Sequence, residues 1–409
     1  MPELPDLIRA EFPSLAHSEL ALFDNAGGTA PCRAVIETIS RYQHECPVQL
    51  GADYPMSVEA TRRLEQASRD AAVMLAGDDA DSIDSGNIVF GSSTTDLIGK
   101  LALALAPQWS AGDEVIVTNF DHEANIGAWR RLADRGLTVR EWQIDSETLR
   151  ADPAALKALL STKTRLVAFT HASNILGDAL PIGELCAMVR EAGALSCVDG
   201  VGYAPHRALN VTAWNCDFYV FSLYKVFGPH CAILYGRDAA MQSTGNLNHE
   251  FHGAASPALR LAPGAFPYEL AAGTSGLMHY LMQLARQVGD ATYASAWRKI
   301  QTHEHELAQL ALNALSARSA VRVIGAATAT ANRLPIISFV AEGHSSAALA
   351  RAFIEHGIAL RFGHFYAPRL VRACGLDPDD GVVRLSLAHY NTREEIGRFS
   401  DALDQLLAA

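Results

Sequence analysis

The 409-residue sequence lacks the features of several specialised protein classes. No apolar run is long enough to cross a bilayer, and the start, MPELPDLIRAEFPSL, has neither the basic nor the apolar region of a secretory signal. The formal net charge of -12 disfavours a nucleic-acid-binding surface, which usually carries an excess of positive charge. We therefore expect a cytoplasmic protein that binds neither membranes nor nucleic acid.

The sequence also lacks paired cysteines. Its seven cysteines are odd in number, scattered, and contain no CxxC pair, so we expect small core residues and neither a disulfide framework nor a zinc site. The segment HEFH at 249–252 raises the question of a metal. No carboxylate or cysteine spacing around it fits a known site, so we predict no metal and interpret the segment as loop surface or substrate wall.

Apolar segments and helical segments alternate along most of the chain. Hydrophobic residues make up 49% of it and charged residues 19%, which is typical of a globular protein with room for two domains. Strand-like segments such as EVIVTNF and RLVAFTH are interleaved with helical segments that end at Gly77, Gly136 and Gly193. Continuous apolar strands between helices predict an α/β fold with a mostly parallel sheet covered on both faces.

The alternation breaks at 239–272, a Gly/Pro/Ala/His-rich connection that we interpret as a long and functional loop. A helical stretch over about 275–317 follows, and then strands mixed with helices. We predict a large domain over residues 20–275. A smaller α+β domain is predicted over residues 276–409, together with the N-terminal segment 1–19.

Polar residues follow the predicted strands at the points where they end. Because the carboxyl ends of parallel strands share one edge of a sheet, these residues are expected to meet in one crevice. Lys225 is the least expected of them, since it lies in the apolar segment FYVFSLYKVFGP and a buried, unpaired ammonium group is costly. It must reach water or be held there for chemistry. The strand-end residues are Ser92 to Thr95, His122, His171, Asp199, Ser222 and Lys225.

This set of residue types suits pyridoxal phosphate. The cofactor needs a lysine for its aldehyde, an acidic residue for its pyridinium nitrogen, and a helix start with hydroxyls for its phosphate. Lys225, Asp199 and the segment SSTTD supply these groups. His122, in the turn DHEAN, is placed to stack on the ring.

Eight segments, in order from about residue 23 onward, make the chain resemble the class V aminotransferase family, in particular its cysteine desulfurase and selenocysteine lyase branch. The resemblance implies fold type I, with a mostly parallel seven-stranded sheet in a large cofactor-binding domain. It also implies a homodimer with active sites at the interface and one pyridoxal phosphate per subunit. The segments are GSSTTDLIG, FDHEANIGAW, THASNILGDALPI, CVDGVGYAPH, CDFYVFSLYKVFGPHCAILYGR, AAGT, ALRFGHFYAP and VRLSLAHYNTREEI.

The resemblance assigns roles to individual residues. It puts the covalent bond to the cofactor on Lys225, the pyridinium contact on Asp199 and ring stacking on His122, and it adds Tyr366 to the catalytic set. Arg384 becomes the clamp for the substrate α-carboxylate, which suits its planar fork. Further cofactor contacts fall on Ser93, Thr94, Thr95, Asn174, Ser222, Tyr224 and, across the dimer interface, Thr274; further substrate contacts fall on Asn25, Asn174, Arg361 and His364.

Three positions depart from the family pattern. The loop cysteine that accepts sulfur in the desulfurases is Tyr366 here, so a typical desulfurase relay is not expected. Gly202 replaces a glutamine that contacts the cofactor's ring oxygen, so that contact is missing. Tyr224 replaces a histidine before the lysine and is still able to donate a hydrogen bond to the phosphate.

Several residues keep a second interpretation. Cys374, eight residues after Tyr366, is either a substitute for the missing thiol or, as we favour, a structural cysteine. His171 is either catalytic or a core histidine. Arg384 is either the carboxylate clamp, as we favour, or an ordinary ion-pair partner.

The predicted reaction starts with removal of the substrate α-proton by Lys225. Three outcomes are then open: loss of a sulfur leaving group from Cβ, transamination, or epimerisation. The resemblance favours elimination, because a lyase that releases its sulfur product directly needs no acceptor cysteine; Tyr366 then protonates the leaving group or lines the pocket.

We therefore predict a carbon–sulfur lyase or desulfurase-like enzyme acting on cysteine or an S-substituted cysteine. The alternative is an aminotransferase or amino-acid epimerase. A non-catalytic scaffold is disfavoured, because Lys225, Asp199 and Arg384 are all retained.

Overall fold

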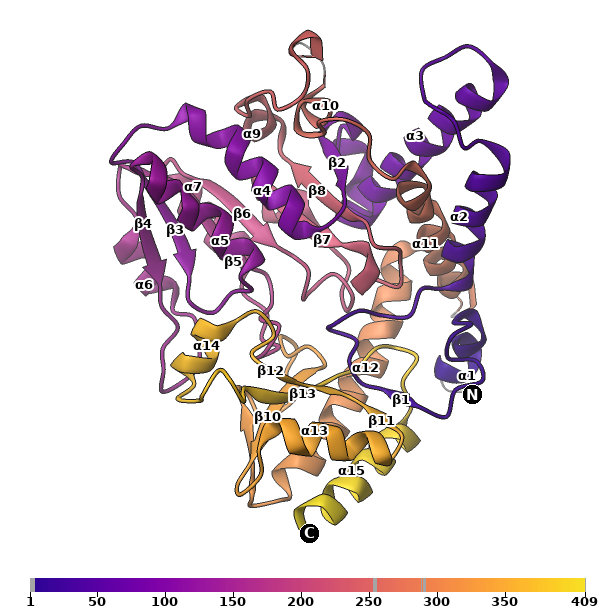
Figure 1. The fold of residues 1–409 in the computed structure, drawn as a ribbon, viewed down its shortest axis with the longest axis vertical. Helices are drawn as coiled ribbons and strands as arrows, with labels where there is room; N and C mark the ends of the chain where they lie inside the picture. The colour runs from indigo at the N-terminus through magenta and orange to yellow at the C-terminus, as the bar shows by residue number, and fades with distance from the viewer. Residues whose placement is uncertain (1–3, 253–255, 288, 290–291, 409) are drawn as a thin grey trace.

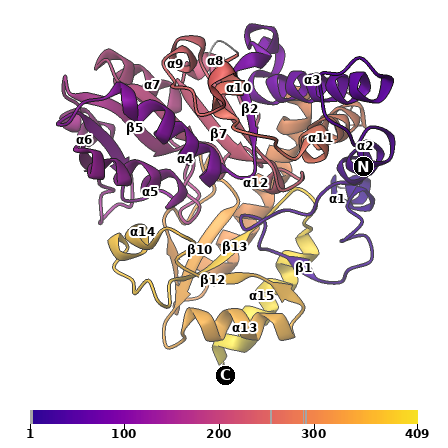
Figure 2. The same cartoon turned by 45° about the horizontal axis from the view of Figure 1, so that its top comes forward.

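The computed structural model describes residues 4–252, 256–287, 289 and 292–408. These residues form a larger part around a seven-stranded sheet and a smaller part around a four-stranded sheet. In Figure 1 the larger part lies above the smaller one. Helix α12 (Tyr293–Ser316) runs from one part to the other, as the tilted view in Figure 2 also shows. Its first half packs under the large sheet and its second half in the smaller part.

The large sheet has the strand order β2-β8-β7-β6-β5-β3-β4. All its neighbouring pairs are parallel except the two that involve β8, which runs antiparallel to β2 and β7. The predicted mostly parallel sheet is therefore confirmed. The strands are β2 (Ile88–Gly91), β3 (Glu114–Thr118), β4 (Thr138–Trp142), β5 (Thr164–Thr170), β6 (Leu195–Asp199), β7 (Phe218–Ser222) and β8 (Ala232–Gly236).

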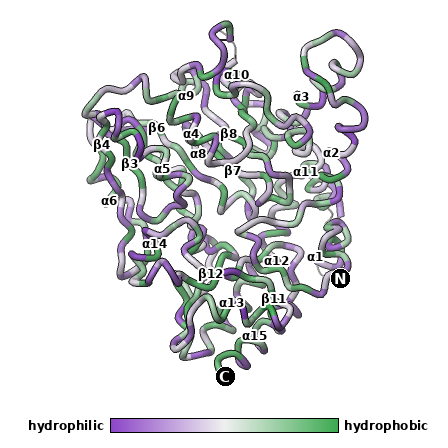
Figure 3. The backbone as a smooth tube through the Cα atoms, in the orientation of Figure 1, coloured by the Kyte–Doolittle hydropathy of each residue, from purple (hydrophilic) through white to green (hydrophobic). Residues whose placement is uncertain are grey.

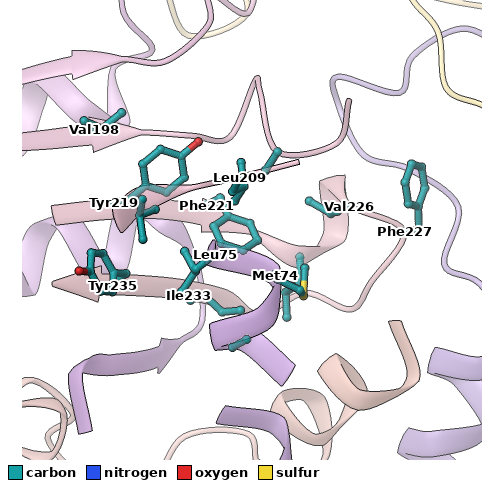
Figure 4. Close-up of a cluster of buried hydrophobic side chains, with 14 of the residues drawn as sticks. Met74, Leu75, Val198, Leu209, Tyr219, Phe221, Val226, Phe227, Ile233 and Tyr235 are labelled. Atoms are coloured by element: carbon teal, nitrogen blue, oxygen red, sulfur yellow. The ribbon is translucent and has the colours of Figure 1, made fainter. Parts of the chain in front are cut away.

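Both faces of the sheet are buried, because successive strand residues point to opposite sides. On β7, Phe218 and Val220 pack with α4 (Thr94–Leu105) and α5 (Ala124–Arg130) on one face. Tyr219 and Phe221 face the other side, where Figure 4 shows them near Met74 and Leu75 of α3 (Pro55–Ala76). This explains why the strands read as continuous apolar runs.

The remaining helices of the larger part are mostly amphipathic. In Figure 3 hydrophobic and hydrophilic residues alternate along most of the tube, as expected for helices that bury one face. They are α1 (Leu4–Ile8), α2 (Arg33–Glu45), α6 (Pro153–Leu159), α7 (Ile182–Glu191), α8 (Val211–Trp214), α9 (Asp238–Gln242), α10 (Pro257–Leu261) and α11 (Tyr268–Gln287). The 3-10 turns are η1 (Arg9–Glu11), η2 (Gly77–Ser82), η3 (Ser85–Asn87), η4 (Ala106–Gln108), η5 (Arg131–Arg135), η6 (Leu223–Lys225) and η7 (Glu250–His252).

The smaller part is an antiparallel sheet of order β12-β13-β10-β9. The N-terminal strand β1 (Ala21–Leu22) joins this part through a parallel pair with β11 (Ile358–Ala359). Its other elements are β9 (Val321–Ile324), β10 (Ile336–Ala341), β12 (Arg361–Gly363), β13 (Val382–Ser386), α13 (Ser346–Glu355), α14 (Pro368–Ala373) and α15 (Arg393–Ala408).

Two local predictions were wrong. The connection at 239–272 is not a continuous loop, because α10 begins at Pro257 and α11 at Tyr268; its residues 253–255 lie outside the described part. The single helical stretch over 275–317 is two helices, since α11 ends at Gln287 and α12 begins at Tyr293. The predicted domain limits stay predictions: residue 275 lies inside α11, and α12 contributes side chains to both parts.

The described residues contain neither a helix suited to span a membrane nor a cluster of metal ligands. Within those ranges, none of the helices combines the length and the apolar character that a membrane span requires. The same part of the chain contains no group of three His, Cys, Asp or Glu side chains that could hold a metal ion.

Candidate active site

Two adjoining cavities lie where β5, β6 and β7 end. The inner cavity encloses about 660 Å³ of space, part of it open to solvent, and the outer cavity leads from it toward the smaller part. Of the predicted residues, those that line the inner cavity are Ser93, Thr94, Thr95, His122, Asn174, Asp199, Ser222, Tyr224 and Lys225. Those that line the outer cavity are His122, Asn174, Tyr224, Lys225, Arg361, His364, Tyr366 and Arg384.

One wall of the inner cavity is the start of α4. Ser93 caps the helix by accepting a hydrogen bond from the backbone N–H of Asp96 at 3.1 Å. The Thr94 and Ser222 hydroxyl oxygens lie 2.8 Å apart, which ties the helix start to the end of β7. Free N–H groups and the helix dipole at such a start favour an anionic group.

Asp199 ends β6 and is 3% exposed. Its Oδ1 accepts a hydrogen bond from the backbone N–H of Val201 at 2.8 Å. Burial raises its carboxyl pKa to about 6. Asp121 is buried nearby, and its pKa is raised by burial and by the negative charge of Asp199. A cationic group in the inner cavity would therefore find a carboxylate prepared to pair with it.

Lys225 lies in the 3-10 turn η6, directly after β7. Burial and the positive charge of Arg384 lower its ammonium pKa to about 8. The apolar run FYVFS is a central strand, and the lysine follows its carboxyl end and lines both cavities. A lysine with a lowered pKa has a substantial neutral fraction near neutral pH, so it can act as a nucleophile or as a base.

His122 stands between the two cavities. Its Nδ1 accepts a hydrogen bond from the backbone N–H of Ala124 at 3.0 Å. Burial and the positive charges of Lys225 and Arg384 lower its pKa to about 3, so the ring is neutral at pH 7. Its ring centroid lies 5.2 Å from that of Tyr366. A neutral, partly buried ring suits the predicted stacking role.

Arg384 is 2% exposed, and its guanidinium group lies 3.8 Å from the centroid of the Phe365 ring. Its Nη1 donates to the Asn174 carbonyl at 3.2 Å, and its Nη2 donates to Asp24 Oδ1 at 3.3 Å. Arg361 lies opposite Arg384 across β12 and β13 and approaches the same Asp24 carboxylate at 3.7 Å. Both predicted arginines line the outer cavity, and the Asp24 carboxylate is shared between them.

The loop with Tyr366 forms the rim of the outer cavity. Phe365 and Tyr366 both have left-handed backbone conformations, with φ of 47° and 59°. Two consecutive non-glycine residues in this region are strained, which is common at functional sites. Two hydrogen bonds stabilise this backbone conformation. The Tyr366 carbonyl accepts from the backbone N–H of Glu123 at 2.7 Å, and the backbone N–H of Tyr366 donates to His364 Nδ1 at 3.1 Å. The Tyr366 side chain is 66% exposed.

Cys374 lies away from this rim. It follows α14, is buried, and is not among the residues that line either cavity. Burial raises the pKa of its thiol to about 11, so little reactive thiolate exists at neutral pH. These observations favour the structural interpretation of Cys374.

His171 and Tyr224 have partners of their own. The His171 ring stacks on Tyr203, with centroids 3.5 Å apart, and its Nδ1 lies 2.9 Å from Tyr219 Oη. It is 3% exposed and does not line the inner cavity, which favours the interpretation as a core histidine. Tyr224 stacks on His230, with centroids 4.7 Å apart.

Two predicted residues are not brought to the cavities. Asn25 is 3% exposed, and its Nδ2 donates to the backbone carbonyls of Leu22 and Ser386, both at 2.9 Å. Thr274 lies fully buried inside α11, where its hydroxyl has no hydrogen-bond partner in the part of the chain that the structure describes. Their predicted contacts stay predictions.

Sequence reasoning missed Asp24, Phe365 and the buried pair of His206 and Glu304, whose atoms Nδ1 and Oε2 lie 3.0 Å apart. His206 lines the inner cavity. A periodic pattern does not signal such contacts, because the partners are distant in sequence. The one available signal was the strand-end rule, since His206 follows β6 by seven residues.

The lowered pKa of Lys225 predicts a pH-dependent stability in protein with a free lysine amine. The unfolded chain keeps this proton up to a pKa of 10.5, whereas the folded chain releases it at about 8. Between these values the unfolded state binds more protons, so the free energy of unfolding should rise with pH. Urea unfolding from pH 7.5 to 10.5 measures this, with Lys225→Met as the matched control that removes the titrating group. An equal pH slope in both proteins would contradict the lowered pKa.

Comparison with known proteins agrees with this architecture. The family model described as "Aminotransferase class-V" matches residues 21–399. The chain is 39% identical over 411 residues to an aminotransferase-like protein, FGM3, of Gibberella zeae, with 98% of each chain covered. It is 33% identical to a cysteine desulfurase-like protein, ustD, of Aspergillus flavus, covering 98% of this chain and 90% of that one.

Among solved structures, the cysteine desulfurase CsdA of Escherichia coli superposes with a TM-score of 0.83 at 26% identity, covering 99% of this chain and 98% of the other. An apo cysteine desulfurase of Thermococcus onnurineus superposes with a TM-score of 0.89 at 22% identity, covering 100% and 99%. The predicted fold class is therefore confirmed.

Proposed function

The chain belongs to the aminotransferase class-V family, and from this premise we propose that it is a pyridoxal-phosphate-dependent carbon–sulfur lyase or desulfurase-like enzyme. Its proposed substrate is cysteine or an S-substituted cysteine. The observation that carries the proposal is the meeting of Lys225, Asp199 and the start of α4 around the inner cavity, with Tyr366 at the rim of the adjoining outer cavity.

The residues around the inner cavity fit pyridoxal phosphate by their chemistry. Ser93, Thr94 and Ser222 would hold a phosphate at the α4 start, and Asp199 would pair with a protonated ring nitrogen. The buried Oδ1 of Asn174 has no hydrogen-bond partner among the described residues and is left for a ligand donor. When bound, the cofactor supplies an aldehyde for amines and a ring that accepts the electron pair from the substrate Cα.

Three residues of the chain have separate proposed roles in binding the substrate and in the reaction. Arg384 binds the substrate α-carboxylate bidentately, while Asp24 and the Phe365 ring hold its guanidinium group in place. Lys225 removes the proton from Cα, for which a pKa of about 8 is well matched to neutral pH. Asp199, a buried carboxyl that lines the inner cavity, would pair with the ring nitrogen and favour its protonated form.

Tyr366 bears on whether the sulfur of the substrate is released directly or transferred to the enzyme. A tyrosine does not form a persulfide, so we propose that the sulfur-bearing product is released directly, with pyruvate and ammonia formed from the rest of the substrate. Tyr366 is exposed, lies beside His122 and lines the outer cavity, which supports a contact between its hydroxyl group and a leaving group. A homodimer with active sites at the interface is part of the proposal and rests on the family resemblance.

A product assay tests the proposed reaction. The purified protein is loaded with pyridoxal phosphate and given cysteine, cystine, S-methylcysteine, alanine and aspartate in parallel, and pyruvate, alanine, sulfide and keto acids are quantified. Pyruvate is expected from each sulfur substrate, together with sulfide from cysteine, methanethiol from S-methylcysteine and free cysteine persulfide from cystine. Alanine with enzyme-bound sulfane sulfur would contradict direct release and restore a desulfurase.

Cys374→Ala is expected to leave the product ratio and kcat unchanged, because the thiol is buried and far more basic than a reactive cysteine. The assay above measures this, and Tyr366→Cys serves as the matched variant that places a thiol at the rim. Loss of sulfur release in Cys374→Ala alone would show that this cysteine replaces the missing loop thiol.

The second candidate is an aminotransferase or amino-acid epimerase. It is supported by the Gibberella zeae relative, which is 39% identical to this chain and is named an aminotransferase-like protein. The same panel separates it, since a keto acid formed from alanine or aspartate, or loss of α-hydrogen label without elimination, would favour it.

A further inference from the structure

A buried ionic cluster borders the inner cavity and has no part in the reaction described above. His206 lies in the turn after β6, is 3% exposed and lines the cavity beside Gly202. Its Nδ1 lies 3.0 Å from Oε2 of Glu304, which is fully buried on α12. Arg207 approaches the same Oε2 at 3.7 Å and donates from Nη1 to the His206 carbonyl at 2.7 Å.

This arrangement determines which ring nitrogen of His206 contacts Glu304 and which is left for a ligand. A carboxylate oxygen accepts hydrogen bonds, and both His206 and Arg207 direct nitrogen atoms at Oε2 of Glu304. We therefore assign the shared proton to His206 Nδ1, so that the other ring nitrogen, Nε2, is not engaged by Glu304. Among the described residues, Nε2 has no hydrogen-bond partner, so it is the atom left for a ligand.

The cluster is costly for a purely structural role. Burying a carboxylate and a guanidinium group against a cavity wall carries a desolvation penalty that apolar side chains would avoid. One oxygen of Glu304, Oε1, is buried without any partner, which adds to the penalty. Clusters of this kind at a cavity wall often mark functional positions.

Gly202 leaves the wall of the inner cavity without a side chain close to His206. A Cβ at this position would lie 2.6 Å from the Ala172 carbonyl oxygen, so no side chain fits there. The chain therefore lacks a side-chain contact to the cofactor's ring oxygen from residue 202. His206 follows four residues later in the same turn and lines the same cavity.

We propose that His206, held by Glu304 and Arg207, is a cofactor-binding residue that forms a hydrogen bond through Nε2 with the ring oxygen of bound pyridoxal phosphate, in place of the side chain absent at Gly202. This inference rests on the proposed cofactor. It also links the cofactor to α12, the helix shared by both parts of the molecule.

Two substitutions separate this role from a structural one. His206→Gln keeps a donor amide at the position of Nε2, and His206→Asn keeps only a group at the position of Nδ1, toward Glu304. The dissociation constant of pyridoxal phosphate and the wavelength of its absorption band are measured by spectroscopic titration of each protein. His303→Gln is the control, since His303 is a buried histidine of α12 that bonds the Asn391 carbonyl at 2.9 Å and does not line the cavity.

We expect His206→Asn to weaken cofactor binding by about tenfold or more and to shift the band, because one charge-assisted hydrogen bond is lost. His206→Gln should retain most of the affinity, Glu304→Gln should resemble His206→Asn in a milder form, and His303→Gln should resemble the wild type. If Asn preserves the titration and Gln does not, or if both match the wild type, the inference is overturned. Failure of the wild-type protein to bind the cofactor would instead sink the proposed function.

Discussion

Lys225→Ala is expected to lose turnover of every amino-acid substrate, with kcat/KM falling by at least about 10²- to 10⁴-fold, the range for removal of a general base. The loss should be larger still, because the same amine is proposed to carry the cofactor. Lys225 lines both cavities, and burial together with Arg384 lowers its pKa to about 8. Steady-state kinetics and the absorption spectrum after addition of cofactor are the measurements.

The control for this variant is Lys100→Ala. Lys100 lies on α4 and pairs with Asp96 one turn away at 2.9 Å, in a partly exposed ion pair. Such pairs contribute little to stability, so Lys100→Ala should keep the wild-type kinetics and spectrum. Turnover by Lys225→Ala close to the wild-type value would rule out the assigned role of this lysine.

Asp199→Asn is expected to lower kcat by about 10²- to 10³-fold, the effect of removing one preorganised electrostatic partner from a buried site. The amide keeps the shape of the side chain, and its oxygen can still accept from the backbone N–H of Val201. Only the negative charge that we propose to pair with the ring nitrogen is lost. Kinetics and a thermal melt on the same sample distinguish this loss from unfolding.

Asp121→Asn is the matched comparison. Asp121 is also a buried carboxyl, but its oxygens accept from the backbone N–H of His122 and from Asn125, both at 2.8 Å, and it does not line the inner cavity. We expect a smaller loss of kcat than for Asp199→Asn. An equal loss in both variants would mean that the charge of Asp199 has no special part in the chemistry.

Strand ends were the most predictive feature of the sequence. His122, Asp199 and Lys225 follow three different strands, and Ser222 shares the end of β7 with Lys225. The structure brings them to one cavity because parallel strands end at a common edge. The rule needs only the pattern of apolar runs. Arg384 came from the family resemblance, and its place on β13 depends on how the smaller part folds.

What the sequence did not predict depends on contacts between distant residues. Asp24 meets Arg384 across 360 positions, and His206 meets Glu304 across 98. Both pairs follow from how the smaller part and α12 pack on the large sheet, which periodicity does not encode. The start of α11 at Tyr268 was missed for a related reason: the segment Gly273 to Gly276 (GTSG) in its early turns has weak helical propensity, and packing against α2 stabilises the helix.

The most direct test of the central claim is to locate the lysine that binds the cofactor. The protein is incubated with pyridoxal phosphate, the carbon–nitrogen bond is made permanent by borohydride reduction, and the modified peptide is identified by mass spectrometry. The predicted result is one modified residue, Lys225, with the adduct absent from Lys225→Ala. An adduct on another lysine such as Lys100, or no adduct at all, would contradict the assignment.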